Sequence, residues 1–153
     1  MWLIVLVAGA SCVASILTAR AVDLFLVERI ALLGSFVGLQ RTVNEGIAFG
    51  LRLGPYQDAI IFLAVLIVIA VAFRSTKKSL EKIGFGLILG GGAANIIDRL
   101  SDGQVTDMIQ VGHFPIFNVA DICINVGVGL LLIEMGLGWW MCRKSRETGR
   151  EKR

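Results

Sequence analysis

The sequence has little charge and only one histidine. Of its 153 residues, 18% are charged and 56% are hydrophobic, and the mean hydropathy is +0.76. Soluble domains have about a quarter of their residues charged, so this composition excludes an ordinary soluble protein. One histidine and three cysteines, without the spacing of a zinc site, argue against a structural metal. An odd number of cysteines in apolar surroundings also argues against a disulfide scaffold, and we predict an integral membrane protein.

The fold class that the sequence predicts is α-helical, with four transmembrane helices in a single membrane domain, residues 1–153. A helix of about 20 apolar residues crosses the hydrocarbon core of a bilayer. The first stretch could instead be a cleaved signal peptide, but such a peptide would need basic residues before its apolar core, and none precedes Trp2. The predicted spans are approximately 2–22, 57–74, 83–98 and 116–141.

Residues 23–56 differ from the predicted spans because charged residues and glycines interrupt the apolar ones. Short runs at 35–39 and 47–51 are typical of strands rather than helices. We therefore expect a small β-rich cradle between the first and second spans, on the outer face of the membrane.

Basic residues predict the orientation of the chain. Of the 15 lysines and arginines, four lie in the loop 74–82 and six in the tail 142–153. Because cytoplasmic loops are enriched in lysine and arginine, both termini and the loop 74–82 are expected to be cytoplasmic. The tail is read as a topology determinant, and no nucleic acid is expected as a partner.

Polar side chains gather in residues 90–121, between and within apolar spans. Inserting a charged side chain into the membrane costs about 2.5–3.5 kcal/mol on insertion scales. The presence of Asp107 and Asp121 beside apolar spans therefore indicates a function for them. Two converging carboxylates in a desolvated site can share one proton, as an aspartyl hydrolase requires. The alternative is that each aspartate caps a helix or pairs with an arginine. Asp107 is placed in a re-entrant stretch, and Asp98 is read as a structural pair with Arg99.

Three motifs together resemble the bacterial lipoprotein signal peptidase family (signal peptidase II), of which the chain would be a divergent member. They are NEGIAFG at 44–50, GGGAANIIDR at 90–99 followed by VTD at 105–107, and FNVAD at 117–121. The resemblance implies an intramembrane aspartyl endopeptidase of the bacterial cytoplasmic (inner) membrane. It would remove the signal peptide from diacylglyceryl-modified prolipoproteins, just before the lipidated cysteine.

The resemblance also implies the site and its partners. Asp107 and Asp121 match the catalytic pair of the family. No metal or organic cofactor is implied. The partners would be the lipidated prolipoprotein, membrane lipids and globomycin-like lipopeptide inhibitors, and we expect a monomer. Residues that match binding or supporting positions of the family are Asn44, Gly46, Asn95, Asp98, Arg99, Asn118 and Ala120.

The sequence departs from the family pattern at three places. The stretch 15–20 carries Ser15 and Arg20 where the family has an aspartate and a lysine, so the first-span aspartate is expected to be missing. Ala94 replaces a glycine before the third-span asparagine. The connection from Asp107 to Asp121 is short, which indicates a truncated or missing lid helix.

Three other functions fit parts of the sequence. A divergent paralogue could bind lipoproteins, or process an atypical substrate. An ion or proton carrier would use intramembrane carboxylates, but it would need them near the middle of the bilayer. Helix packing through the glycine-rich third span would leave Asp107 and Asp121 unexplained.

Overall fold

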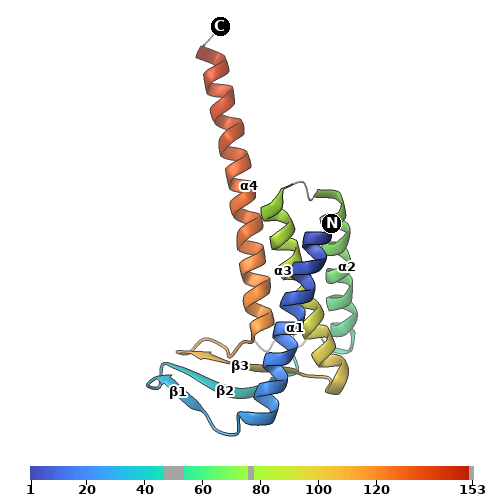
Figure 1. Ribbon diagram of the computed structural model, residues 1–153, viewed down its shortest axis with the longest axis vertical. Helices are drawn as coiled ribbons and strands as arrows, with labels where there is room; N and C mark the ends of the chain where they lie inside the picture. The colour runs from blue at the N-terminus through green and yellow to red at the C-terminus, as the bar shows by residue number, and fades with distance from the viewer. Residues whose placement is uncertain (47–53, 76–77, 152–153) are drawn as a thin grey trace.

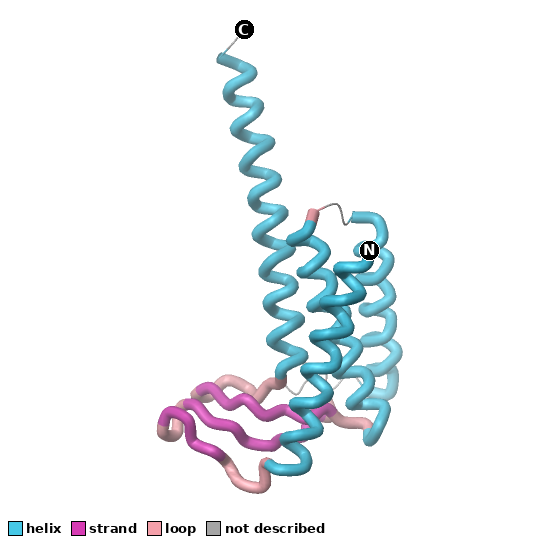
Figure 2. The backbone as a smooth tube through the Cα atoms, in the orientation of Figure 1, coloured by secondary structure: helices cyan, strands magenta, loops and turns pink. Residues whose placement is uncertain are grey.

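The computed structural model describes residues 1–46, 54–75 and 78–151. In Figures 1 and 2 the helices stand side by side, the strands lie across one end of the bundle, and α4 extends well past the other end. The elements in chain order are α1 (Trp2–Phe25), β1 (Ile30–Leu33), β2 (Val37–Asn44), η1 (Gly54–Tyr56), α2 (Gln57–Ser75), α3 (Ser79–Asp102), β3 (Val105–Val111) and α4 (Val119–Glu151).

The helices confirm the predicted fold class. Trp2–Phe25, Ser79–Asp102 and Val119–Lys144 are long and apolar enough to cross a membrane, and Ala59–Ala72 within α2 forms a shorter apolar helix. Large apolar side chains such as Leu17 and Leu132 are exposed on the bundle surface, as expected for a surface that faces lipid. The helices are longer than the predicted spans, because α1 and α3 continue through charged residues at their ends.

Helix α3 is the centre of the bundle, and glycines let its neighbours approach it closely. A Cβ atom built on Gly90 would lie 1.9 Å from the Ser11 hydroxyl oxygen of α1. A Cβ atom on Gly91 would lie 2.5 Å from the Ala120 carbonyl oxygen in the first turn of α4. Small residues therefore fix the distance between α3 and its two partners. Ala94, which replaces a glycine of the family pattern, is buried in this region of α3.

The strands form one antiparallel sheet in the order β1-β2-β3. Thr42 pairs with Asp107, and Asn44 pairs with Val105. The β-rich element predicted between α1 and α2 is thus present. The prediction was incomplete, because the third strand of the sheet comes from the segment after α3. The prediction of a re-entrant stretch around Asp107 is wrong. Asp107 lies in β3, which pairs with β2 in the antiparallel sheet.

One predicted strand is partly wrong and another cannot be compared. Residues 34–36 form the turn between β1 and β2, so only the last part of the predicted run 35–39 lies in a strand. Gly34 takes a φ of 55° in this turn, which suits a residue without a side chain. The predicted run 47–51 lies outside the described residues.

Two tight connections bring β3 and α4 to the same place. Helix α3 ends at Asp102, and the next residue, Gly103, has a φ of 84° and donates its N–H to the Arg99 carbonyl oxygen at 2.7 Å. After β3, residues 112–118 form a turn and a bridge in which Phe117 N–H donates to the Ile109 oxygen at 3.1 Å. This segment contains no helix, as its short length indicated.

Candidate active site

The FNVAD motif builds the start of α4. Asn118 precedes the first helical residue, and its side-chain oxygen accepts from the Asp121 N–H at 2.9 Å. In return, the Asp121 carboxylate accepts from the Asn118 N–H at 3.1 Å. This reciprocal capping pattern satisfies two backbone donors that a helix start leaves without intrahelical partners. The Asp121 side chain is therefore held at the first turn of the helix.

The Asn118 side chain also connects the two aspartates. Its amide nitrogen donates to Asp107 Oδ1 at 2.8 Å and to Asn95 Oδ1 at 3.2 Å. Asn95, on α3, donates in turn to Asp121 Oδ1 at 3.1 Å. Asn44, at the end of β2, donates to Asp107 Oδ2 at 3.0 Å. Three asparagines from three elements thus orient both carboxylates.

Asp107 is almost inaccessible, with 3% of its surface exposed. Burial disfavours the charged carboxylate and raises its pKa from 3.8 to about 6, and the nearby Asp121 charge acts in the same direction. Hydrogen bonds from Asn44 and Asn118 and the charge of Arg99 act against this rise. A carboxyl group with this pKa can hold or release a proton close to neutral pH.

Arg99 and Gly46 support the site from the side of β2. The buried Arg99 guanidinium donates to the Gly46 carbonyl oxygen at 2.5 Å. The Gly46 N–H donates to the Asn44 side-chain oxygen at 2.8 Å. Arg99 therefore fixes the segment that carries Asn44, and Asn44 in turn contacts Asp107.

Both aspartates line a cavity of about 660 Å³. Its polar end also carries Asn44, Asn95 and Asn118. The rest is largely apolar, with side chains from α2, α3 and α4 that include Val65, Val68, Ile88, Ile122 and Val126. Such a cavity suits a ligand with one polar group and long apolar parts.

The expected pair of Asp98 and Arg99 is wrong. Asp98 Oδ2 accepts from the Thr106 N–H at 2.8 Å, and so ties the end of α3 to the start of β3. Arg99 instead contacts Gly46, because neighbouring residues of a helix point in different directions. Ala120 is 2% exposed and packs against Gly91, so it supports the position of Asp121 and does not line the cavity.

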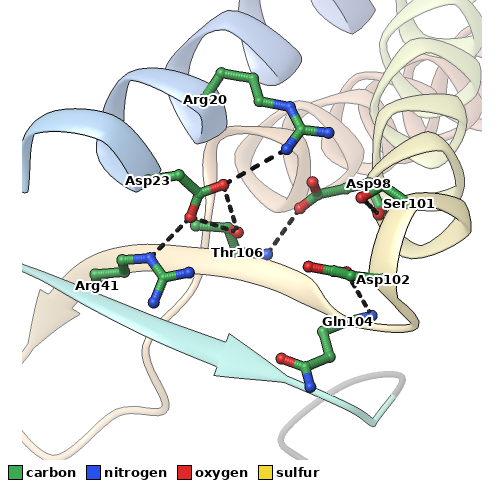
Figure 3. Close-up of polar contacts among 8 residues, drawn as sticks. All are labelled: Arg20, Asp23, Arg41, Asp98, Ser101, Asp102, Gln104 and Thr106. Carbon is green, nitrogen blue, oxygen red and sulfur yellow. Dashed lines mark hydrogen bonds and ion pairs between the residues drawn. The ribbon is translucent and has the colours of Figure 1, made fainter.

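The first helix does contain an aspartate, contrary to expectation. Helix α1 continues to Phe25, so Asp23 lies in its last turn. Asp23 accepts hydrogen bonds from Thr106 Oγ1 at 3.2 Å and from Arg41 Nε at 2.8 Å, and Arg20 lies 3.8 Å away (Figure 3). Val27 lies four residues after Asp23, so no lysine follows this aspartate at that spacing.

Asp23 lies one residue beyond the predicted span 2–22, because charged residues are not expected inside an apolar membrane helix. Thr106, which donates to Asp23, is the residue directly before Asp107 in β3. The carboxylate of Asp23 is thus part of the framework beside the candidate site.

Comparison with known proteins gives consistent matches. Residues 3–137 match the family model described as Signal peptidase (SPase) II. Proteins named lipoprotein signal peptidase from Brucella ovis and Brucella canis are each 33% identical over 112 residues, which cover 68% of this chain and 70% of theirs.

Two solved structures described as a bacterial membrane enzyme are similar in fold. One gives a TM-score of 0.73 at 24% identity and covers 86% of each chain. The other gives 0.72 at 25% identity and covers 86% of this chain and 91% of its own.

Proposed function

Because the chain belongs to the signal peptidase II family of aspartic peptidases, we propose that Asp107 and Asp121 are its catalytic pair and that its substrate is a diacylglyceryl-modified prolipoprotein. The observation that carries this proposal is the joint hydrogen-bonding of both carboxylates to Asn118. Asn118 contacts the Asp107 carboxylate through its side-chain amide and the Asp121 carboxylate through its backbone N–H, so one residue holds both groups at a single end of the cavity.

The proposed reaction is hydrolysis of one peptide bond by the two carboxyl groups. The raised pKa lets Asp107 hold a proton near pH 6, and the proposed reactive state has one carboxyl group of the pair protonated and the other ionised. The ionised carboxylate takes a proton from a water molecule, whose oxygen attacks the scissile carbonyl carbon. The protonated carboxyl donates to the carbonyl oxygen and stabilises the tetrahedral oxyanion.

The collapse of this intermediate completes the reaction. The C–N bond breaks, and a proton moves from the pair to the leaving amine of the lipidated cysteine. The products are a signal peptide with a new carboxylate and a lipoprotein with a new amino terminus. Asn44, Asn95 and Asn118 hold the carboxylates in place, and so reduce the reorganisation that this sequence of proton transfers requires.

The position of the carboxylates disfavours an ion or proton carrier. Asp107 lies on β3 and Asp121 in the first turn of α4, at the end of the bundle where the sheet lies (Figure 1). A carrier would need ionisable groups near the middle of the spans. The apolar part of the cavity, by contrast, fits the acyl chains of a lipidated substrate.

We further propose that the sheet end faces outward and that both termini are cytoplasmic. The opposite end carries Lys78, which forms a short hydrogen bond with Glu134, and Arg143 and Lys144, which lie over tryptophan rings. Tryptophans and basic residues in this arrangement are typical of a cytoplasmic membrane interface. The site would then meet lipoprotein precursors in the outer leaflet.

A monomer should be sufficient, because one chain supplies every residue of the proposed site. We propose that globomycin-like lipopeptides occupy the same cavity, since they too combine a polar peptide with an apolar tail. Globomycin is then expected to raise the melting temperature of the purified protein and to compete with the substrate.

The function is tested by incubating the purified protein with two versions of one prolipoprotein, with and without the diacylglyceryl group. Mass spectrometry of the products locates the cut. We expect cleavage immediately before the cysteine in the lipidated version and at least tenfold slower cleavage of the other. A folded protein that binds the lipidated precursor but never cuts it would favour the binding paralogue.

A further inference from the structure

On α4, one polar side chain besides Asp121 lines the cavity. Asn125 lines the cavity one helical turn after Asp121 and is exposed there. Its amide nitrogen donates to the Asp121 carbonyl oxygen at 2.9 Å. Among the described residues, its second N–H and its side-chain oxygen have no other hydrogen-bond partner.

The surroundings of Asn125 make this amide unusual. Most other residues that line this cavity, such as Val68, Ile88 and Val126, are apolar. Polar atoms of an amide that lack a partner cost about 1–3 kcal/mol when they leave water, and a membrane helix can avoid that cost by using an apolar residue. The hydrogen bond to the preceding turn also holds the amide in a fixed direction. Both features are expected of a group that meets a polar atom of the ligand.

We propose that Asn125 donates a hydrogen bond to an ester carbonyl of the diacylglyceryl group on the substrate. This inference rests on the proposed function, because the diacylglyceryl group belongs to that substrate. Asn125 would be a positioning residue that recognises the lipid and places the scissile bond, without taking part in the chemistry.

The geometry of the helix supports this pairing. Asn125 lies four positions after Asp121, which is about 6 Å along the helix axis. In the substrate, only the cysteine side chain and part of the glycerol separate the scissile bond from the first ester. An ester offers acceptors and no donors, and Asn125 has an N–H to give. The acyl chains would continue past Asn125 into the apolar part of the cavity.

The test compares two substrates that differ only in the bond to the acyl chains. One prolipoprotein peptide carries the diacylglyceryl group, and the other a dialkylglyceryl group, whose ethers lack carbonyl oxygens. Each is cleaved by the wild type, by Asn125→Leu and by Asn125→Ala. Val128→Ala is the matched control, because Val128 is an exposed apolar residue of α4 that does not line the cavity.

With the ester substrate, both Asn125 variants should lower kcat/KM about tenfold, mainly through KM. With the ether substrate, the wild type should show a similar loss and the variants no further one, because the two changes remove the same hydrogen bond. Val128→Ala should leave both rates unchanged. If the Asn125 variants lose kcat/KM equally on both substrates, the proposal is overturned and the amide instead contacts the peptide or supports the helix. If they lose kcat/KM on neither substrate, the proposal is overturned as well.

A second measurement does not depend on cleavage. The ester carbonyl is labelled with ¹³C and its infrared band is recorded in substrate bound to Asp107→Asn, with and without Asn125→Leu. A hydrogen bond lowers the stretching frequency, so the band should move up when Asn125 is replaced. An unchanged band overturns the proposal even if the protein cuts the substrate normally. Failure of the wild type to cut either substrate would instead count against the proposed function.

Discussion

At the scale of single residues, asparagines determine the geometry of the site. Asn118 has two separable roles, because its oxygen caps α4 and its nitrogen contacts Asp107 and Asn95. The FNVAD motif is therefore both a helix-start signal and a means of holding two carboxylates together. The alternative interpretation, that Asp121 belongs to a helix cap, is correct as structure and compatible with catalysis.

Asn118→Ser should separate these two roles. Serine caps a helix about as well as asparagine, so most of the stability should remain, but its short side chain cannot reach Asp107. We expect kcat to fall about 10- to 100-fold, as for the loss of a hydrogen bond to a charged group. Asn118→Ala should lower kcat by a similar factor. It should also lower the free energy of unfolding by roughly 0.5–2 kcal/mol, the usual cost of removing an N-cap side chain. Equal activity of Asn118→Ser and the wild type would contradict this assignment.

The raised pKa of Asp107 predicts how stability depends on pH. The folded pKa of about 6 exceeds the ordinary value of 3.8, so this group's contribution is fully present below about pH 4 and is lost as the pH rises through 6. Asp107→Asn has no proton to lose there. Its unfolding free energy relative to wild type should therefore rise by roughly 1–3 kcal/mol between about pH 4 and pH 7.5.

Chemical unfolding in detergent at both pH values measures this change. Glu28→Gln is the control, because Glu28 is exposed and its replacement should shift stability equally at both. A difference between Asp107→Asn and wild type that stays constant across this range would contradict the raised pKa.

At the scale of elements, packing of small residues positions the carboxylates. Gly91 lets α3 touch the turn of α4 that carries Ala120 and Asp121. The sheet then adds Asp107 from β3, and α1 supports β3 through Asp23 and Thr106. The geometry of the proposed catalytic pair thus depends on contacts between elements that are far apart in the sequence.

Gly91→Ala tests the contact between α3 and α4. The added methyl carbon would lie 2.5 Å from the Ala120 carbonyl oxygen, so the helices must separate. We expect a loss of about 1–3 kcal/mol of stability and a lower kcat. Gly129→Ala is the matched control on α4, because its Cβ atom would meet nothing within 4 Å. It should be neutral or stabilising by about 1 kcal/mol, and a similar effect in both variants would contradict the packing account.

The sequence predicted the helices, and most of the polar residues that the fold gathers around the cavity, better than it predicted the sheet. Apolar length is a local property, so the spans and the motif residues could be read directly. The strand β3 could not, because its pairing with β2 joins Asp107 to Thr42 across 65 positions of chain. The length of α1 and the direction of Asp98 were misjudged for a related reason: their charged side chains are satisfied by partners that only the fold brings near.

At the scale of the whole molecule, charge and aromatic residues indicate how the bundle lies in the membrane. The sheet lies at one end, whereas the extended part of α4 continues at the other (Figure 2). Arg143 lies 5.6 Å from the Trp139 ring centre and Lys144 lies 5.3 Å from that of Trp140. These contacts suit basic side chains that reach from the interface towards water.

The orientation can be tested with an impermeant maleimide on spheroplasts. In a background without Cys12 and Cys123, the exposed Cys142 should react only after the membrane is permeabilised. His113→Cys with Cys142→Ser should react in intact spheroplasts, because residue 113 is exposed in the turn after β3 at the sheet end. The reverse pattern would place the site on the cytoplasmic side and contradict the account.

The most direct test of the catalytic pair compares Asp107→Asn and Asp121→Asn with the wild type on the diacylglyceryl-modified substrate. Asparagine keeps the shape of the side chain and removes the proton that each step needs. Asp102→Asn is the control, because Asp102 is exposed at the end of α3 and does not line the cavity. We predict that both site variants fold and bind substrate but lose at least 1,000-fold in kcat, while the control retains full activity. A near-normal rate in either site variant would contradict the proposed mechanism.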